Sequence, residues 1–188
     1  MKNRATIIPM ILSVIALTLY FGYRNIYLEN KSSENNFNSV KLMSDFELND
    51  IEGNRISISN WAGQDLIINF WATWCAPCLR EIPLLKEYQL QNDSAQVIGI
   101  AVDRLEPVKN FINDIGFNYP ILIGQSEAIG VAKMLGIDVF ALPLTFFITK
   151  EGMITETHIG ELLPEDLKSG LEKMHYSSCL LYTSDAAD

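Results

Sequence analysis

The sequence is poor in cysteine and histidine. Its 188 residues include three cysteines and two histidines. Three cysteines are too few to hold a small domain together by disulfides, so the core must form by ordinary apolar packing. A structural zinc site commonly needs two cysteine pairs, or one pair with two histidines at short spacing. Since His158 and His175 lie far apart in the sequence and lack such spacing, we predict no structural metal site.

Basic residues are also scarce. The chain has 14 Lys and Arg against 23 Asp and Glu, which gives a formal net charge of -9. Nucleic-acid binding requires clustered positive side chains to neutralise phosphates, and no stretch of the chain carries such a cluster. We therefore predict no nucleic-acid partner. The length and the 48% hydrophobic content instead suit one globular domain with a terminal appendage, and no internal repeat is present.

The N-terminal segment lacks the features of a cleaved export signal. Lys2 and Arg4 precede nineteen uncharged residues, Ala5 to Tyr23, which at about 1.5 Å per residue nearly span the roughly 30 Å bilayer core. A cleavable signal has a shorter apolar run and small residues at its cleavage site, and a lipoprotein has a cysteine after the run. Residues 1–28 are therefore predicted to be an uncleaved membrane anchor, with a cleaved signal as the alternative. Basic residues flank both ends of this segment, so they do not by themselves set its orientation in the membrane. The position of the segment ahead of the whole domain favours export of that domain.

A polar tether and then alternating elements follow the anchor. Residues 29–39 are rich in Asn and Ser and are expected to form a flexible linker to a domain over 40–178. Alternating apolar and polar residues around Asp50 to Asn54 predict a β-hairpin. The apolar run 65–74 is typical of a strand buried on both faces, and helical spacing predicts a helix from Pro77 to about Leu90.

Strands and helices continue to alternate toward the C-terminus. Ser126 is expected to cap the N-terminus of one helix and Gly136 its C-terminus. The predicted segments are a strand at 96–102, a helix at 106–115, a strand at 119–124, a helix at 126–135, a hairpin at 142–160 and a closing helix at 163–174. This pattern indicates an α/β domain with a mostly parallel sheet, covered on both faces and carrying one antiparallel edge.

The last ten residues do not match this plan. Residues 179–188, CLLYTSDAAD, are expected to interrupt the closing helix with small polar residues. They resemble a translated transposase adaptor used in DNA library preparation, so we predict a non-native tail. Cys179 is accordingly not expected to take part in the chemistry.

The other two cysteines, Cys75 and Cys78, form a Cys-x-x-Cys pair. Covalent haem attachment needs a histidine directly after the second cysteine, where this chain has Leu79. A peroxide-reducing cysteine needs no partner three positions on. A Sco-type copper chaperone has a distant histidine, which His158 could supply, but its two cysteines are one residue further apart. A permanent disulfide across so short a loop would constrain the unfolded chain little.

The surroundings of the pair favour thiol–disulfide exchange. The preceding strand delivers Cys75 to a helix N-terminus, where free N–H groups and the helix dipole stabilise a thiolate. Such a position lowers the pKa of a cysteine thiol below its usual value of about 8.5. Cys78 lies one helical turn further on, where it should be less exposed and can reach back to close a disulfide.

The segment LIINFWATWCAPCLREIP, residues 66–83, resembles the active-site segment of the thioredoxin superfamily, specifically of its TlpA/ResA-like, membrane-anchored thiol-disulfide oxidoreductases. The resemblance extends from about Val40 to Met174. It includes an inserted strand and helix at about 96–115 and, at 141–152, the sequence ALPLTFFITKEG. It implies a thioredoxin-like fold, with a central mixed, mostly parallel sheet flanked by helices and preceded by an N-terminal β-hairpin.

The resemblance also implies roles for individual residues. Cys75 corresponds to the nucleophile and Cys78 to the resolving thiol, so the redox-active disulfide replaces any cofactor. Pro143 corresponds to a cis-proline beside the disulfide, and with Leu142 it would offer backbone groups to an extended substrate. The alternative is a trans-proline that merely begins an edge strand. The residues expected to bind substrate are Trp74, Ala76, Pro77, Leu142 and Pro143.

One departure from thioredoxin concerns proton transfer. Thioredoxin has a buried acid six residues before its nucleophile, where this chain has Asn69, which cannot exchange a proton. Glu81 matches an acidic position of ResA-like proteins and is the candidate base for Cys78. Its alternative role is a carboxylate that only stabilises the helix N-terminus. Trp71 and Trp74 are expected to pack and shield, and His158 to be structural.

The resulting prediction is a protein-disulfide reductase on the extracytoplasmic (periplasmic) side of the cytoplasmic membrane. The resemblance implies exported, disulfide-containing substrates, for example apocytochrome c during cytochrome c maturation. It also implies a membrane electron donor of the CcdA/DsbD type. A disulfide oxidase or isomerase is the alternative, because Ala76 and Pro77 do not determine the reduction potential. A Sco-like copper chaperone is the lesser alternative.

Overall fold

The computed structural model describes Leu17, Tyr20 and residues 45–91, 94–137 and 141–184. The predicted anchor and linker lie outside the described residues, apart from Leu17 and Tyr20. No helix within the described ranges is long and apolar enough to cross a membrane. The chain divides into two units, Met1–Asn38 and Ser39–Asp188, and all the described strands belong to the second.

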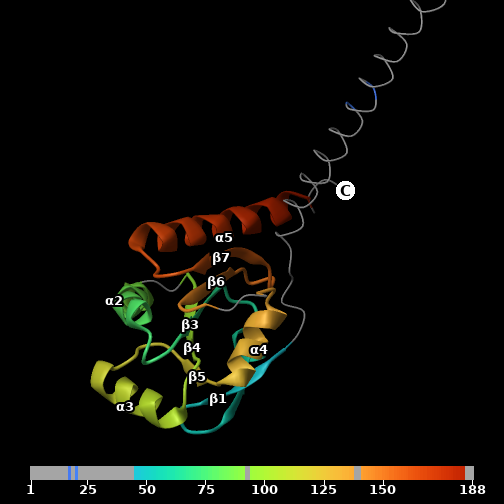
Figure 1. The fold of residues 1–188 in the computed structure, drawn as a ribbon. Coiled ribbons are helices and arrows are strands. Elements are labelled where there is room, and N and C mark those ends of the chain that lie inside the picture. Colours follow the sequence, from blue (N-terminus) through green and yellow to red (C-terminus); the bar gives the residue numbers. More distant parts are fainter. Residues whose placement is uncertain (1–16, 18–19, 21–44, 92–93, 138–140, 185–188) are drawn as a thin grey trace, which may run out of the picture. The chain divides into compact units, whose positions relative to one another are not determined.

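The second unit is an α/β domain in which helices cover a central sheet (Figure 1). Its described elements, in chain order, are β1 (Glu47–Asp50), β2 (Arg55–Ser57), the 3-10 helix η1 (Ile58–Trp61), β3 (Leu66–Trp71), α2 (Ala76–Gln91), β4 (Gln96–Ala101), α3 (Leu105–Ile115), β5 (Ile121–Ile123), α4 (Ser126–Met134), β6 (Leu144–Ile148), β7 (Ile154–Ile159) and α5 (Pro164–Ser184).

The sheet is mixed, with the strand order β2-β1-β5-β4-β3-β6-β7. Of its six strand pairings, only β3–β4 and β4–β5 are parallel. The predicted mixed sheet and its antiparallel β6–β7 edge are therefore confirmed, but the prediction that most of the sheet is parallel is wrong. The connections through α2 and α3 join strands that run in the same direction. The two hairpins and the connection through α4 join strands that run in opposite directions. The predicted hairpin around Asp50 to Asn54 is confirmed as β1 and β2.

Side chains alternate between the two faces of the sheet, and each face has its own core. On one face, Ile67 and Trp71 of β3 pack with apolar residues of α2, α3 and α5. On the other face, Ile68 and Phe70 of β3 pack with apolar residues of α4 and η1. Figure 1 shows the same division, with α2 and α3 across the strands from α4, and α5 beside β6 and β7. All six residues of β3 are buried, as the apolar run predicts.

Two helix ends differ from prediction. The N-cap of α4 is Gln125, so Ser126 is its first helical residue, and Leu135 rather than Gly136 is its C-cap. Helix α5 continues to Ser184, so residues 179–184 do not interrupt it. No proline or glycine follows Gly170 in this stretch, and the residues present all tolerate a helical backbone. The adaptor origin of 179–188 stays a prediction.

Candidate active site

A disulfide joins Cys75 and Cys78 at the start of α2. Because β3 ends at Trp71 and α2 begins at Ala76, Cys75 stands directly before the helix, and its carbonyl accepts a hydrogen bond from the Leu79 N–H at 3.1 Å. Cys75 is 6% exposed and Cys78 is fully buried. The prediction that Cys78 is the less accessible cysteine is confirmed.

The loop before Cys75 is anchored by Asp103, which follows β4. The Thr73 N–H and hydroxyl both donate to Asp103 Oδ2, the N–H at 3.1 Å, and the Arg104 N–H donates to Asp103 Oδ1 at 2.7 Å. Asp103 is almost completely buried. Sequence reasoning missed this residue. The sequence does carry a signal for it, because Asp103 comes two residues after the end of β4, at the edge of the sheet where the neighbouring parallel strand β3 also ends.

The residues expected to bind substrate differ in exposure. Trp74 is 70% exposed and Ala76 is exposed, whereas Pro77 and Leu142 are half-buried. Leu142 packs against the apolar cluster that contains both cysteines. The Leu142–Pro143 peptide bond is cis, and the Pro143 carbonyl accepts from the Gly160 N–H at 2.9 Å. The structure thus brings the Pro143 segment to the same cluster as the disulfide.

The two tryptophans have different environments. Trp71 is fully buried and stacks on Phe117 with ring centroids 5.4 Å apart, so its predicted packing role is confirmed. The indole lies over Gly99, where an added Cβ would be 3.1 Å from Trp71 Nε1 and 2.6 Å from Ile121 Cδ1. Trp74 is not a packing residue, because most of its side chain is exposed.

A polar group is buried within the apolar layer below α2. Asn69 of β3 donates through Nδ2 to Glu81 Oε1 at 2.7 Å and to Thr145 Oγ1 at 3.0 Å. Asn69 and Thr145 are fully buried, and Glu81 is 1% exposed. In the sequence, Asn69 stands out only because thioredoxin has an acid at this position, whereas in the structure it is a direct hydrogen-bond partner of Glu81.

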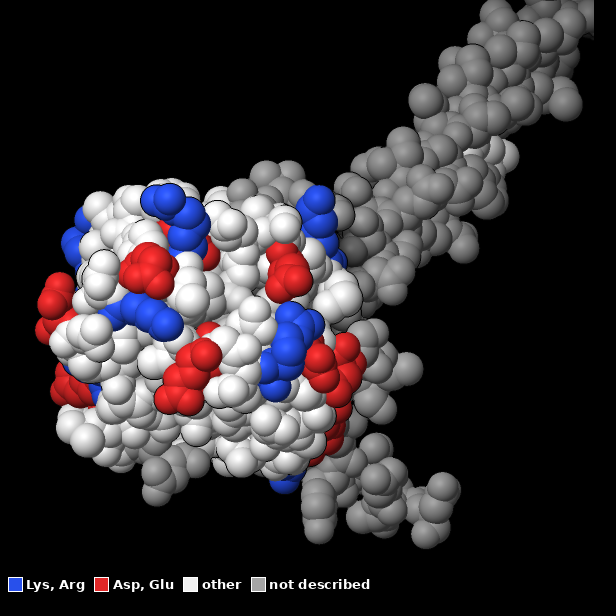
Figure 2. Space-filling model, turned by 90° about the horizontal axis from the view of Figure 1, so that it is seen from below, with Lys and Arg blue, Asp and Glu red and all other residues white. Residues whose placement is uncertain are grey.

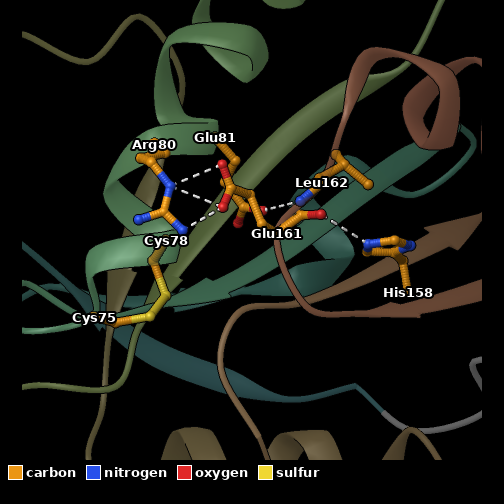
Figure 3. A network of polar contacts seen from close by, with 7 residues as sticks. All are labelled: Cys75, Cys78, Arg80, Glu81, His158, Glu161 and Leu162. Carbon is orange, nitrogen blue, oxygen red and sulfur yellow. Dashed lines mark hydrogen bonds and ion pairs between the residues drawn. A yellow bond between two sulfur atoms is a disulfide. The ribbon is translucent and has the colours of Figure 1, made fainter.

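The Glu81 carboxyl is held from both sides. Its Oε2 accepts from the Leu162 N–H at 2.6 Å, as Figure 3 shows. Burial raises the pKa of Glu81 to about 7, while the hydrogen bonds from Leu162 and Asn69 oppose the rise and the charge of Glu161 adds to it. Glu81 is therefore a buried carboxyl that titrates near neutrality, one helical turn beyond Cys78. Such a group can exchange a proton at neutral pH.

His158 takes part in a different set of contacts. It belongs to β7, and its Nε2 lies 3.2 Å from the Glu161 carbonyl oxygen and 3.8 Å from Asp166 Oδ2. Figure 3 shows the Arg80–Glu161 pair between His158 and the disulfide. Within the described part of the chain, no group of three His, Cys, Asp or Glu residues is placed to hold a metal ion.

Comparisons with known proteins agree with this geometry. The sequence profile of the AhpC/TSA family matches residues 41–157. Thiol-disulfide oxidoreductase ResA from Bacillus thuringiensis (strain Al Hakam) is 32% identical over 181 residues, which cover 92% of this chain and 98% of that protein. The crystal structure of StoA from Bacillus subtilis has a TM-score of 0.56 at 27% identity and covers 68% of this chain and 96% of that one. The structure of a thiol:disulfide interchange protein from Chlorobium tepidum TLS has a TM-score of 0.60 at 28% identity and covers 68% and 91%.

A thioredoxin-like fold with a Cys-x-x-Cys disulfide at the start of a helix defines the class of thiol-disulfide oxidoreductases. The chain belongs to the AhpC/TSA family, and its relatives make it a thiol-disulfide oxidoreductase of the ResA type.

Proposed function

We propose that the protein reduces disulfides of exported proteins outside the cytoplasm, through a cycle of the Cys75–Cys78 pair. The observation that carries this proposal is the buried Glu81 carboxyl, one turn beyond the buried Cys78. A reductase releases its product only if its second thiol becomes a thiolate, and a buried thiol needs a nearby proton acceptor to do so. Glu81 is that acceptor.

The cycle has two exchange steps. The Cys75 thiolate attacks one sulfur of the substrate disulfide, so that a Cys75–substrate disulfide forms and the other substrate sulfur leaves as a thiolate that takes up a proton. Cys78 then gives its proton to Glu81 and attacks the Cys75 sulfur, which forms the Cys75–Cys78 disulfide and releases the second substrate thiolate. The substrate gains two electrons and the enzyme dithiol loses two. A membrane donor of the CcdA/DsbD type would return two electrons to the enzyme.

The direction of electron flow is supported by charge. An oxidase depends on a strongly stabilised nucleophilic thiolate, which a neighbouring cation favours. Here Arg80, the cation of the first turns of α2, is paired with Glu161. Its charge is therefore largely neutralised by a carboxylate rather than directed at Cys75.

The proposed partners are supported by the surface of the domain and by the anchor predicted from the sequence. Exposed Trp74 and the Pro143 segment offer an apolar docking area for an extended polypeptide. On the face shown in Figure 2, Lys and Arg side chains stand among acidic and uncharged ones, which suits protein substrates better than nucleic acid. Residues 1–28 would anchor the protein in the cytoplasmic membrane with the domain on the periplasmic side. Apocytochrome c is the candidate substrate.

The reduction potential of the Cys75–Cys78 pair tests the direction. We expect equilibration of the full chain with glutathione or dithiothreitol buffers to give a value below about −200 mV, toward thioredoxin's −270 mV. A value near −120 mV would instead identify an oxidase.

The roles of the cysteines are tested by insulin reduction. Cys75→Ser should reduce activity to the background rate, whereas Cys78→Ser should accumulate a mixed disulfide through Cys75. His158→Ala is the control and should keep wild-type activity. A tight Cu(I) complex that requires Cys75, Cys78 and His158 together would support the copper chaperone instead.

A further inference from the structure

Two neighbouring residues of α2 hold two neighbouring residues of the loop between β7 and α5. Arg80 binds the Glu161 carboxylate through two of its nitrogens, with Nε 3.0 Å from Oε1 and 2.8 Å from Oε2, and Nη2 also bonded to Oε2. The next residue on each segment makes the second link, since Leu162 N–H donates to Glu81 Oε2 at 2.6 Å. Figure 3 shows both links side by side, next to the disulfide.

The remaining contacts of this loop, 160–163, lead away from α2. Gly160 N–H donates to the Pro143 carbonyl at 2.9 Å, and the Glu161 carbonyl lies 3.2 Å from His158 Nε2. Leu163 N–H donates to Asp166 Oδ2 at 3.0 Å. These bonds tie the loop to β6, β7 and α5. The distance between the loop and Glu81 therefore depends on the packing of Leu162 and on the Arg80–Glu161 pair.

We propose that the Arg80–Glu161 ion pair is a latch that holds the loop 160–163 against α2 and so keeps the Leu162 N–H on the Glu81 carboxylate. Arg80 and Glu161 are positioning residues in this scheme, because they act on the redox site through Glu81. The inference rests on the proposed function, in which Glu81 accepts the proton of Cys78. An Arg–carboxylate pair bonded through two nitrogens suits this task, because its planar geometry fixes orientation as well as distance.

The alternative is an ordinary surface ion pair. The side chain of Arg80 is 59% exposed and that of Glu161 is 29% exposed, and pairs at this exposure contribute little to global stability. A global stability measurement would therefore not separate the two roles. The pKa of Glu81, which is a local property, does separate the two roles.

The groups that face Glu81 make this separation possible. Asn69 and Leu162 donate to its oxygens, and Cys78 and Arg80 lie on its own helix. Tyr119 is buried, and this burial and the charge of Glu81 raise the pKa of its hydroxyl, which therefore stays neutral over the Glu81 titration. The Glu161 charge raises the pKa of Glu81, whereas the Leu162 hydrogen bond lowers it, and the hydrogen bond has the larger effect.

A latch and a simple charge pair therefore predict different signs. If the pair is a latch, Arg80→Ala and Glu161→Ala both release the Leu162 N–H, and both raise the pKa of Glu81. If the pair acts only through its charges, Arg80→Ala raises the pKa because a cation is lost. Glu161→Ala then lowers the pKa, because an anion is lost.

The experiment follows the Glu81 carboxyl and the Leu162 amide by NMR in the oxidised full chain in detergent micelles. We expect both alanine variants to move the Glu81 titration midpoint upward by about 0.5–1 pH unit and to speed hydrogen exchange at the Leu162 amide. Lys173→Ala is the matched control, because it breaks the 2.9 Å ion pair with Glu156 between α5 and β7 without touching the loop. It should change neither measurement.

A charge swap provides the rescue. The double variant Arg80→Glu, Glu161→Arg should restore slow exchange at Leu162. Midpoints that move in opposite directions in the two alanine variants, or an unchanged Leu162 exchange rate, would overturn the latch. Neither measurement depends on turnover, so a failure of the proposed function can be told apart from a failure of the latch. If the proposed function is wrong, Glu81→Gln leaves the pH–rate profile of disulfide reduction unchanged, while the latch results still hold.

Discussion

The two faces of the central sheet are built from the same strands but have different contents. The described core of the face toward α4 is built from apolar side chains, with Phe70 and Phe146 of neighbouring strands in edge-to-face contact at 5.9 Å. The face toward α2 carries the disulfide and the buried polar group of Asn69, Thr145 and Glu81. Since successive side chains of a strand point to opposite faces, β3 and β6 stabilise one core and support the chemistry of the other.

The face toward α2 contains groups that oppose stability. Asn69 Oδ1 and Trp71 Nε1 are buried without a hydrogen-bond partner among the described residues. Each such group costs about 1–3 kcal/mol relative to a satisfied one. Burial of Glu81 adds a further cost at neutral pH. One layer of the sheet therefore supplies stability, and the other spends part of it to hold a titratable carboxyl near the cysteines.

The largest effect is expected from the apolar face. Phe146→Ala should lower the free energy of unfolding by about 3–5 kcal/mol, because a fully buried ring is replaced by a cavity. Chemical denaturation measures this loss. Leu90→Ala is the control, since Leu90 is 80% exposed, and it should change stability by less than about 0.5 kcal/mol. A shift of the Glu81 titration in Phe146→Ala would show that the two faces are not independent.

A smaller effect is expected from the pH dependence of the polar face. The pKa of Glu81 rises from 4.5 to about 7 on folding, so the folded state binds the proton more tightly than the unfolded state. This contribution to stability is present below pH 4.5 and is lost as the pH rises to about 7. The loss is about 3 kcal/mol. The free energy of unfolding of the oxidised protein should be measured between pH 4 and pH 8. Glu81→Gln should remove the contribution of Glu81 to the dependence of this free energy on pH.

Glu87→Gln is the matched control for that experiment. Glu87 lies on the same helix and is exposed, so the wild-type slope should remain. Equal slopes in wild type and Glu81→Gln would mean that Glu81 titrates near its ordinary pKa, and the distinction between the two faces would lose its electrostatic basis.

The smallest effect is expected from a single hydroxyl. Thr145→Val removes the acceptor of one Asn69 N–H bond and should lower stability by about 1 kcal/mol. It should also raise the pKa of Glu81, because Asn69 is no longer held in place as a donor. Ile148→Val deletes one methyl group on the opposite face of the same strand, with a similar loss of stability. Only Thr145→Val should move the Glu81 titration, as followed by NMR.

Local features of the fold followed from the sequence. The apolar run of β3, the β1–β2 hairpin and the helix that begins after Cys75 all lie where the pattern predicts. The antiparallel edge formed by β6 and β7 also followed. The antiparallel pairing of β6 with β3 and of β1 with β5 did not follow, because it depends on how the α4 connection and the β1–β2 hairpin are placed against the sheet. The continuation of α5 beyond Ser178 was missed because small polar residues disfavour a helix without ending it.

The candidate site was predictable only in part. The motif identified Cys75, Cys78 and Glu81, but the partners of Glu81 are Asn69, 12 residues earlier, and Leu162, 81 residues later. Arg80 and Glu161 are also 81 residues apart and show no pattern that would pair them. Opposite charges are frequent along the chain, and only the packed structure determines which of them meet.

The sequence by itself determined the redox chemistry, because two thiols at a strand-to-helix junction suffice for a local disulfide at a helix N-terminus. It also determined the class of fold, through the alternation of apolar strands and helices. Only the tertiary structure decided the burial of Glu81, its contacts with Asn69 and Leu162 and the link from Arg80 to Glu161. Local propensities act over one turn or strand, whereas desolvation and hydrogen bonding of a buried carboxyl depend on segments that meet only when the whole sheet is assembled.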